Sequence, residues 1–260
     1  MKIGPKICAI HAFVLLLVAP ILIQITYADE SEPHFVQLQE YKPIYFITGT
    51  PDTKVQFSFK GQLVREIPFY FAYTQLLMWD LFKKGAPISD VNFNPELFYR
   101  VYTSEVSNQW LDFGIFEHES NGHGANPQER SWNRASLTYH SGETLGEKSR
   151  VLWSFKAWLP FTLNSNNSDL SRYRGIWELQ MTLVNLLGPF FEANELSLRL
   201  YPGGPWLSNP IAGGQELTLK TKINFKPFLP FFVMQIFHGY GENLLNYNDE
   251  RTAFRVGIGF

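Results

Sequence analysis

The feature that most constrains the fold of this 260-residue chain is the alternation of apolar and polar side chains in short segments. It is clearest at 55–60, 195–200 and 216–225. Successive side chains of a β-strand point to opposite faces, so each segment would present one apolar and one polar face. Hydrophobic residues make up 45% of the chain, yet its mean hydropathy is only -0.13, as this interleaving requires. The sequence therefore predicts strands that have two chemically different faces.

Turn signals rich in glycine, proline and asparagine separate these runs at 49–52, 85–87, 164–168, 202–205 and 226–227. We expect strands near 43–48, 53–62, 68–79, 95–104, 109–119, 131–140, 150–161, 174–185, 192–200, 214–225, 230–240 and 251–260. Their number is even, which is typical of single-chain barrels in bacterial outer membranes. In such barrels the apolar face points to lipid and the polar face to the lumen. We therefore predict an all-β fold, a twelve-stranded antiparallel transmembrane β-barrel.

The amino terminus has the pattern of a secretory signal. Lys2 and Lys6 precede an apolar stretch over 7–25, and the small residue Ala28 offers a cleavage site. We predict a signal peptide at 1–28 and a barrel domain at 29–260, with an uncleaved membrane anchor helix as the alternative. The only cysteine, Cys8, lies in this segment, so the mature chain would have no disulfide. Beyond residue 28, no run of eighteen apolar residues predicts a transmembrane helix.

The last strand supports the same interpretation, because Phe254, Val256, Ile258 and Phe260 alternate up to the final residue. A terminal aromatic on an alternating strand resembles the recognition signal of outer-membrane barrel proteins. A soluble secreted β-protein that binds a ligand is the alternative. The net charge of -2 provides no basic surface for nucleic acid, so we expect no nucleic-acid partner.

Two neighbouring motifs contain residues that could perform catalysis, EHESNG at 117–122 and RSWNR at 130–134. His118 and Ser120 are two residues apart, so a strand would place them on one face. A serine needs an adjacent base to become a nucleophile, and the base needs a partner that fixes its tautomer. Asn133 would pair back near His118 across a hairpin, and a neutral amide can orient an imidazole. The motifs suggest His118 as base, Ser120 as nucleophile and Asn133 as orienting residue, although a His-x-Ser pair is common by chance.

The face that carries this pair is expected to point to lipid. Simple alternation along the strand predicts that this face carries Trp110, Gly114, Phe116, His118 and Ser120. Asp112 has the same parity and breaks the apolar pattern. Trp158 fits an aromatic girdle at the membrane interface, whereas Arg100, Glu178 and Lys220 fit a polar lumen.

The two motifs, together with NFNPELF at 92–98, KAW at 156–158 and HGYGENLLNYN at 238–248, resemble outer membrane phospholipase A. The resemblance covers the chain from about residue 42 to its end. It implies calcium-dependent hydrolysis of acyl esters in phospholipids and lysophospholipids (phospholipase A1/A2) by Ser120, His118 and Asn133. It also implies a homodimer as the active form, in the outer membrane of a Gram-negative bacterium. The alternative is a non-enzymatic barrel, a pore or an adhesion protein, that retains the motif.

The resemblance further implies where calcium would bind. It points to the main-chain carbonyl of His123, to Glu129 in place of a family serine, and to Gly85 from a neighbouring subunit. A further calcium position, associated with the monomer, would fall near Asn166. Carboxylate oxygen is a good calcium ligand, although Glu129 also fits a solvated loop charge. His118 and Asn133 are fifteen residues apart, one more than the family spacing we expect. The extra residue falls in the turn-like segment 124–127, so the matching carbonyl is that of His123 or of an adjacent position.

Overall fold

The computed structural model describes residues 36–124, 126–186, 193–205, 207, 209–222 and 230–260, so the predicted signal peptide at 1–28 lies outside the described residues. The described strands are β1 (Leu38–Glu40), β2 (Tyr45–Thr50), β3 (Thr53–Val64), β4 (Ile67–Trp79), β5 (Ile88–Ser104), β6 (Gln109–Ser120), β7 (Ser131–Leu145), β8 (Ser149–Leu163), β9 (Trp177–Val184), β10 (Asn194–Gly203), β11 (Asn209–Thr221), β12 (Phe231–Gly239) and β13 (Arg251–Gly259). The short helices η1 (Ser165–Asn167) and α2 (Ser171–Arg174) lie between β8 and β9.

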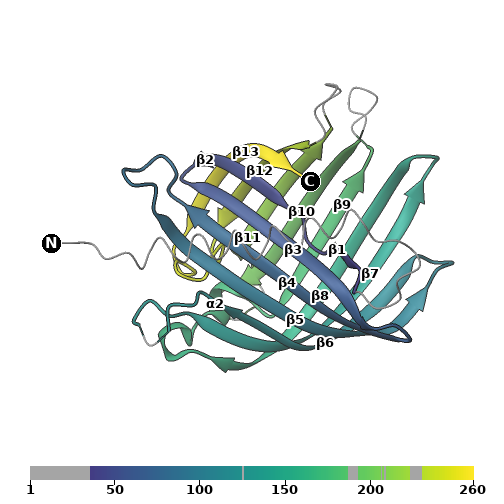
Figure 1. Cartoon of the computed structure of the whole chain (residues 1–260), viewed down its shortest axis with the longest axis horizontal. Coiled ribbons are helices and arrows are strands. Elements are labelled where there is room, and N and C mark those ends of the chain that lie inside the picture. The colour runs from purple at the N-terminus through teal and green to yellow at the C-terminus, as the bar shows by residue number, and fades with distance from the viewer. Residues whose placement is uncertain (1–35, 125, 187–192, 206, 208, 223–229) are drawn as a thin grey trace.

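Strands β2 to β13 form a closed, twelve-stranded antiparallel barrel, which confirms the predicted fold class (Figure 1). Each strand pairs with the next along the chain, and β13 returns to pair with β2. The short strand β1 pairs with β3 beside this closure. Closure satisfies the backbone hydrogen bonds of every strand without leaving an open edge. Within the described residues, no helix is long and apolar enough to cross a membrane.

The expected strands all correspond to strands of the barrel, and the largest difference in position is at the start of β5. Strand β5 begins at Ile88, whereas the sequence predicted a start near residue 95. Its first half contains Asp90, Asn92 and Asn94, whose polar side chains point inward and are buried. These residues alternate with Val91 and Phe93, so the alternation that predicts the other strands extends back into this segment as well.

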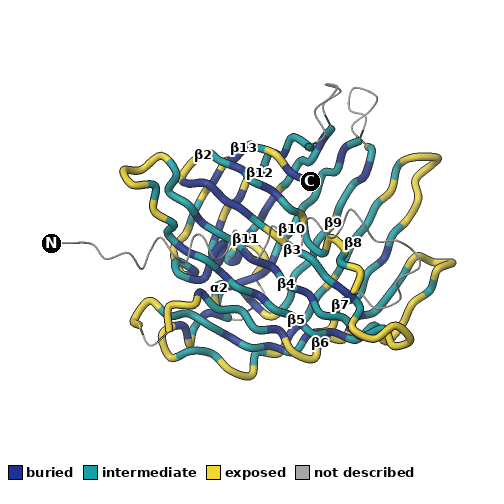
Figure 2. Tube along the Cα trace, viewed as in Figure 1, coloured by how far each residue is buried: buried dark blue, intermediate teal, exposed yellow. Residues whose placement is uncertain are grey.

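The barrel has an inverted distribution of polarity. Buried side chains include many charged ones, among them Lys54, Glu117, Arg134 and Arg255, whereas large apolar side chains such as Leu159 are exposed on the wall. Figure 2 shows buried and more exposed positions alternating along the strands, with fully exposed positions frequent in the hairpin turns. An outward apolar face and an inward polar face are what a barrel in lipid requires.

A bulge in β6 changes which residues share a face. The pairing of β6 with β7 shifts register between Gly114 and Glu117, and both residues in between, Ile115 and Phe116, are exposed. Asp112 therefore points inward, where Arg100 donates to it at 2.8 Å. The prediction that Gly114 and Phe116 share a face was wrong, because an extra residue reverses the alternation. The same bulge accounts for the apparent anomaly at Asp112.

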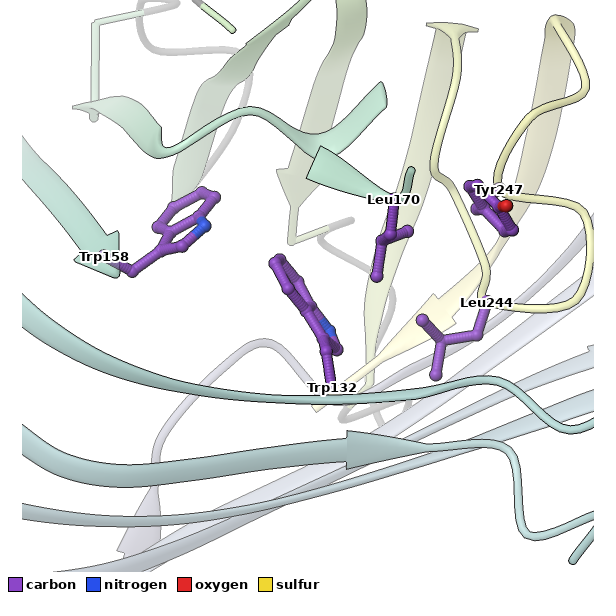
Figure 3. Close-up of a cluster of buried hydrophobic side chains, with 5 residues drawn as sticks. All are labelled: Trp132, Trp158, Leu170, Leu244 and Tyr247. Atoms are coloured by element: carbon purple, nitrogen blue, oxygen red, sulfur yellow. The ribbon is translucent and has the colours of Figure 1, made fainter. Parts of the chain in front are cut away.

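Two loops pack against the strands at one end of the barrel. Trp132 of β7 and Trp158 of β8 form a hydrophobic cluster with Leu170, Leu244 and Tyr247 from two loops (Figure 3). The indole N–H of Trp158 donates to the carbonyl of Gly175 at 3.1 Å. Trp158 therefore packs inside the barrel mouth, and its predicted place in an aromatic girdle was wrong. The cluster ties the loop before β9 and the loop before β13 to the end of the β6–β7 hairpin.

Candidate functional site

The three residues that the sequence singled out for catalysis lie at the end of the β6–β7 hairpin. His118 on β6 is the cross-strand partner of Asn133 on β7, and Ser120, the last residue of β6, is the partner of Ser131. The Nδ1 atom of His118 is 2.8 Å from the Oδ1 atom of Asn133. Because an amide oxygen can only accept, Nδ1 carries the proton in this contact and Nε2 keeps its lone pair. This is the tautomer that a general base needs.

The hairpin directs these side chains to the outer wall of the barrel. Glu117 is buried inside, so the next residue, His118, points outward, and Ser120 follows on the same face. The ring of Phe116 lies parallel to the imidazole of His118, at 6.3 Å between centroids, and Phe161 packs against Phe116. The His118 and Ser120 side chains therefore stand on the face that lipid covers, beside an aromatic surface.

The loop that follows Ser120 is held by a residue to which the sequence analysis gave no role, Asn121. Its backbone N–H donates to the carbonyl of Arg130 at 3.0 Å. Its side chain donates to the carbonyl of Gln128 at 2.8 Å and accepts from the N–H of Arg130 at 2.9 Å. Asn121 is buried, so these bonds are shielded from water. Asn121 is thereby held to Gln128 and Arg130 next to the candidate nucleophile.

Gly122 makes the first turn of this loop with a φ of +68°, a conformation that glycine adopts without steric cost. A Cβ atom at this position would lie 3.0 Å from the ring of Phe93 on β5. The loop backbone therefore lies close against the neighbouring strand. This fixes the direction of the main-chain N–H groups that follow Ser120.

The four predicted calcium positions fall into two groups. His123, Glu129 and Asn166 belong to neighbouring loops, because the side chain of Asn166 donates to the carbonyl of Asn126 at 3.3 Å. Gly85 lies in the separate turn between β4 and β5, with a φ of +80°. In the described part of the chain, no three His, Cys, Asp or Glu side chains gather as a metal site. Carboxylate, amide and carbonyl oxygens are nonetheless the donor types that calcium prefers, so the chemistry of the first group fits this ion.

The lumenal side of the hairpin contains residues that sequence reasoning did not assign to the site. The side chain of Asn94 on β5 donates to the carbonyl of His118 at 2.9 Å. Glu117 and Glu119, which flank His118, both contact Arg134. Alternation predicts that these residues point inward, but their partners become apparent only once the strands are assembled.

The comparisons with known proteins agree with this architecture. The family model of phospholipase A1 matches residues 11–260. A phospholipase A1 of Klebsiella pneumoniae is 31% identical over 196 residues, which cover 72% of this chain and 60% of that protein. The chain thus matches less than two thirds of the length of its curated relatives.

Two solved structures have the same fold. Outer membrane phospholipase A from Escherichia coli aligns with a TM-score of 0.71 at 23% identity, covering 90% of this chain and 94% of that one. The calcium-bound dimer of the Salmonella typhi outer membrane phospholipase aligns with a TM-score of 0.68 at 24% identity, covering 89% and 94%. The barrel and its relatives place this protein in the outer membrane of a Gram-negative bacterium. Since the family model covers nearly the whole chain, the protein belongs to the phospholipase A1 family.

Proposed function

We propose that this protein hydrolyses acyl ester bonds of phospholipids and lysophospholipids, as a calcium-dependent phospholipase A1/A2 of the outer membrane. The observation that carries the proposal is the hydrogen bond between His118 and Asn133 on the lipid-facing wall. His118 lies two residues before Ser120, on the same face of β6. A phospholipid in the surrounding membrane would reach these residues without entering the lumen. Family membership supports the same reaction.

The proposed reaction has two halves. The Ser120 hydroxyl attacks the ester carbonyl while His118 Nε2 takes its proton, and that proton then passes to the departing lipid alcohol as the ester bond breaks. Water next attacks the acyl-serine, again giving a proton to His118, which returns it to Ser120 as the fatty acid leaves. Asn133 holds Nδ1–H throughout, so the imidazole keeps its orientation.

Negative charge develops on the carbonyl oxygen in both halves. The main-chain N–H of Gly122, fixed by the positive-φ turn, is the protein donor that we assign to it. Calcium held by the main-chain carbonyl of His123 and by Glu129 would add positive charge beside this oxygen. The carboxylate of Glu129 is the stronger of these two donors, because a carboxylate oxygen is a good ligand for this hard cation.

We also propose that the active form is a homodimer. A calcium-bound dimer is known for the Salmonella typhi relative. Gly85 lies in a different loop from the other calcium candidates, which suits a contribution from a second copy. Dimerisation would then control activity by mass action.

Release of fatty acid from phospholipid in mixed micelles tests the proposal. We expect hydrolysis by the wild type with calcium, and its loss in Ser120→Ala and after chelation. Ser107→Ala is the matched control, because Ser107 lies in the β5–β6 turn, away from Ser120. Retention of activity in Ser120→Ala would contradict the mechanism, and full activity after chelation would contradict the metal. A folded wild type without hydrolysis would favour a pore or an adhesion protein.

A further inference from the structure

The hairpin that carries the candidate triad has a second, lumenal face with its own chemistry. Alternation directs the side chains of His118, Ser120 and Asn133 to the lipid side. It directs the side chains of Glu117, Glu119 and Arg134 to the lumen. On the lumenal side, the Nη2 atom of Arg134 donates to the Oε1 atom of Glu117 and lies 3.2 Å from the Oε2 atom of Glu119. One guanidinium thus joins the two carboxylates on either side of His118.

The contacts around Arg134 fix it in turn. Its Cζ atom lies 3.9 Å from the ring centroid of Trp132 and 5.3 Å from that of Trp158, distances that suit cation–π attraction. The indole N–H of Trp132 donates to Glu119 at 2.9 Å. Lys156 contacts the second oxygen of Glu117 at 2.7 Å. Each carboxylate that Arg134 joins therefore has another partner on a neighbouring position or strand.

This cluster is buried, with 6% of the Arg134 side chain and 2% of the Glu117 side chain exposed. Loss of one partner from a buried ion pair leaves an uncompensated charge, so the remaining groups must move. Any such movement is transmitted to the backbone of β6 and β7. The backbone positions of His118 and Asn133 are bonded directly to those of Glu117 and Arg134.

The strand ladder is irregular around the candidate triad. Register shifts occur between Gly114 and Glu117 in the β6–β7 pairing and between Asn133 and Arg134 in the β7–β8 pairing. A bulge interrupts the ladder and bends its strand, so ladder bonds restrain this region less than a regular one. Beyond the first of these shifts, the β6–β7 ladder is regular from the pair Glu117 and Arg134 to the pair Ser120 and Ser131. On the inner side of this short regular stretch, Arg134 makes the side-chain contacts to Glu117 and Glu119 that cross the two strands.

We propose that Arg134 is a positioning residue, which sets the geometry of His118 and Asn133 through Glu117 and Glu119. The inference rests on the proposed esterase mechanism. Reacting groups must be placed within a fraction of an ångström, and a displacement of about 1 Å can reduce a rate about 100-fold. Arg134 would act on the rate of the chemical step and leave substrate binding nearly unchanged, because it never meets the lipid.

The test compares three purified, folded variants in mixed micelles with calcium. For Arg134→Met we expect kcat to fall about 100-fold with KM changed less than about threefold. For Arg134→Lys we expect a smaller fall, about tenfold, because lysine keeps the charge but loses the planar fork. Arg199→Met is the control, since Arg199 forms a lumenal ion pair with Glu178 at 3.0 Å on other strands. We expect this control to keep the kcat of the wild type.

The rate at which a sulfonyl fluoride modifies Ser120 provides a second readout, which depends on His118 but not on turnover. The proposal is supported if the labelling rate of Ser120 and kcat fall together in Arg134→Met and neither falls in Arg199→Met. Wild-type values for Arg134→Met, or an equal fall in Arg199→Met, overturn it. If Arg134→Met does not fold, Glu117→Gln and Arg134→Lys decide by the same criteria. Activity that survives in Ser120→Ala would instead refute the mechanism, so the two failures are distinguishable.

Discussion

Asn133 accepts a single hydrogen bond from the imidazole of His118, and this makes its role testable by two substitutions. Asn133→Ala removes the acceptor, so the ring loses its fixed tautomer and orientation. We expect kcat to fall about 100-fold or more, as expected when a base loses its orienting partner. Asn133→Asp keeps an acceptor at the same position and should retain most of the activity. Equal kcat values for Asn133→Ala and the wild type, measured by fatty-acid release, would contradict the role.

Gly122 offers a second test, because a side chain there would be strained and would also meet Phe93. We expect Gly122→Ala to lower the free energy of unfolding by about 1 kcal/mol through its positive φ alone, and to reduce kcat by displacing the loop. Gly146→Ala is the control, since Gly146 has a φ of +76° but nothing within 4 Å of an added Cβ. The two variants should share the loss of stability, measured by thermal unfolding, while only Gly122→Ala loses activity. Equal kcat values in both would contradict a role for the loop.

At this scale the sequence was informative where contacts are local. His118 and Asn133 belong to one hairpin, so their motifs predicted a contact that the structure contains. The link from Asn94 to the carbonyl of His118 joins residues 24 positions apart, and no local pattern indicates it. The role of Ser120 stays a prediction, because it depends on chemistry rather than on pairing.

Strand β6 shows how one element determines the orientation of the site. Without the bulge at Ile115 and Phe116, the face that carries Asp112 would also carry His118, and the imidazole would point into the lumen. The variant that lacks Ile115 should therefore lose hydrolysis, or it should fold into a barrel in which the register of β6 against its neighbours is altered. Deletion of Glu147 in the β7–β8 turn is the control, and we expect it to preserve activity. Full activity after deletion of Ile115 would show that the bulge does not orient the site.

The strands themselves were predictable, because alternation and turn residues mark them independently of the fold. The bulge was not, since nothing in 111–118 distinguishes an extra residue from a break in the apolar pattern at Asp112. Trp158 was misplaced for a related reason. An aromatic residue on a strand fits both a girdle and an inward cluster, and only the loops that cover the mouth decide between them.

In the molecule as a whole, charged side chains occupy the space that apolar ones fill in a soluble protein. Lys54 of β3 bonds to Glu216 of β11 at 2.7 Å, so one ion pair joins strands that are not neighbours in the barrel. Arg255 of β13 bonds to Asp52 in the β2–β3 turn and to Glu242 in the loop between β12 and β13. Such pairs are shielded from salt, unlike those on a surface. The lumen therefore acts as a polar core that links the barrel wall to the loop between β12 and β13.

Glu242 is the residue of this loop whose side chain lies in the polar core. Its ion pairs predict how the stability of the protein changes at acidic pH. Its side chain is 1% exposed, 2.6 Å from Arg255 and 3.3 Å from Lys54. Burial raises the pKa of Glu242, but Lys54 and Arg255 more than offset this and hold the pKa below its usual value. The resulting stabilisation is complete above the unfolded pKa of about 4.3 and is lost as pH falls through the lower folded value.

Glu242→Gln should consequently destabilise the protein by about 3 kcal/mol near neutral pH, since it leaves two buried cations undercompensated. The difference from the wild type should narrow as the pH falls below about 4, where the wild-type carboxylate also takes up a proton. Thermal unfolding in detergent between neutral pH and pH 3 measures this difference. Glu250→Gln is the control, because Glu250 lies at the end of the same loop with 57% of its side chain exposed. We expect this substitution to change the free energy of unfolding only slightly, by an amount that does not depend on pH. A Glu242→Gln difference that is constant with pH would mean that the loop is held by its packing on Trp132 and Leu170 rather than by charge.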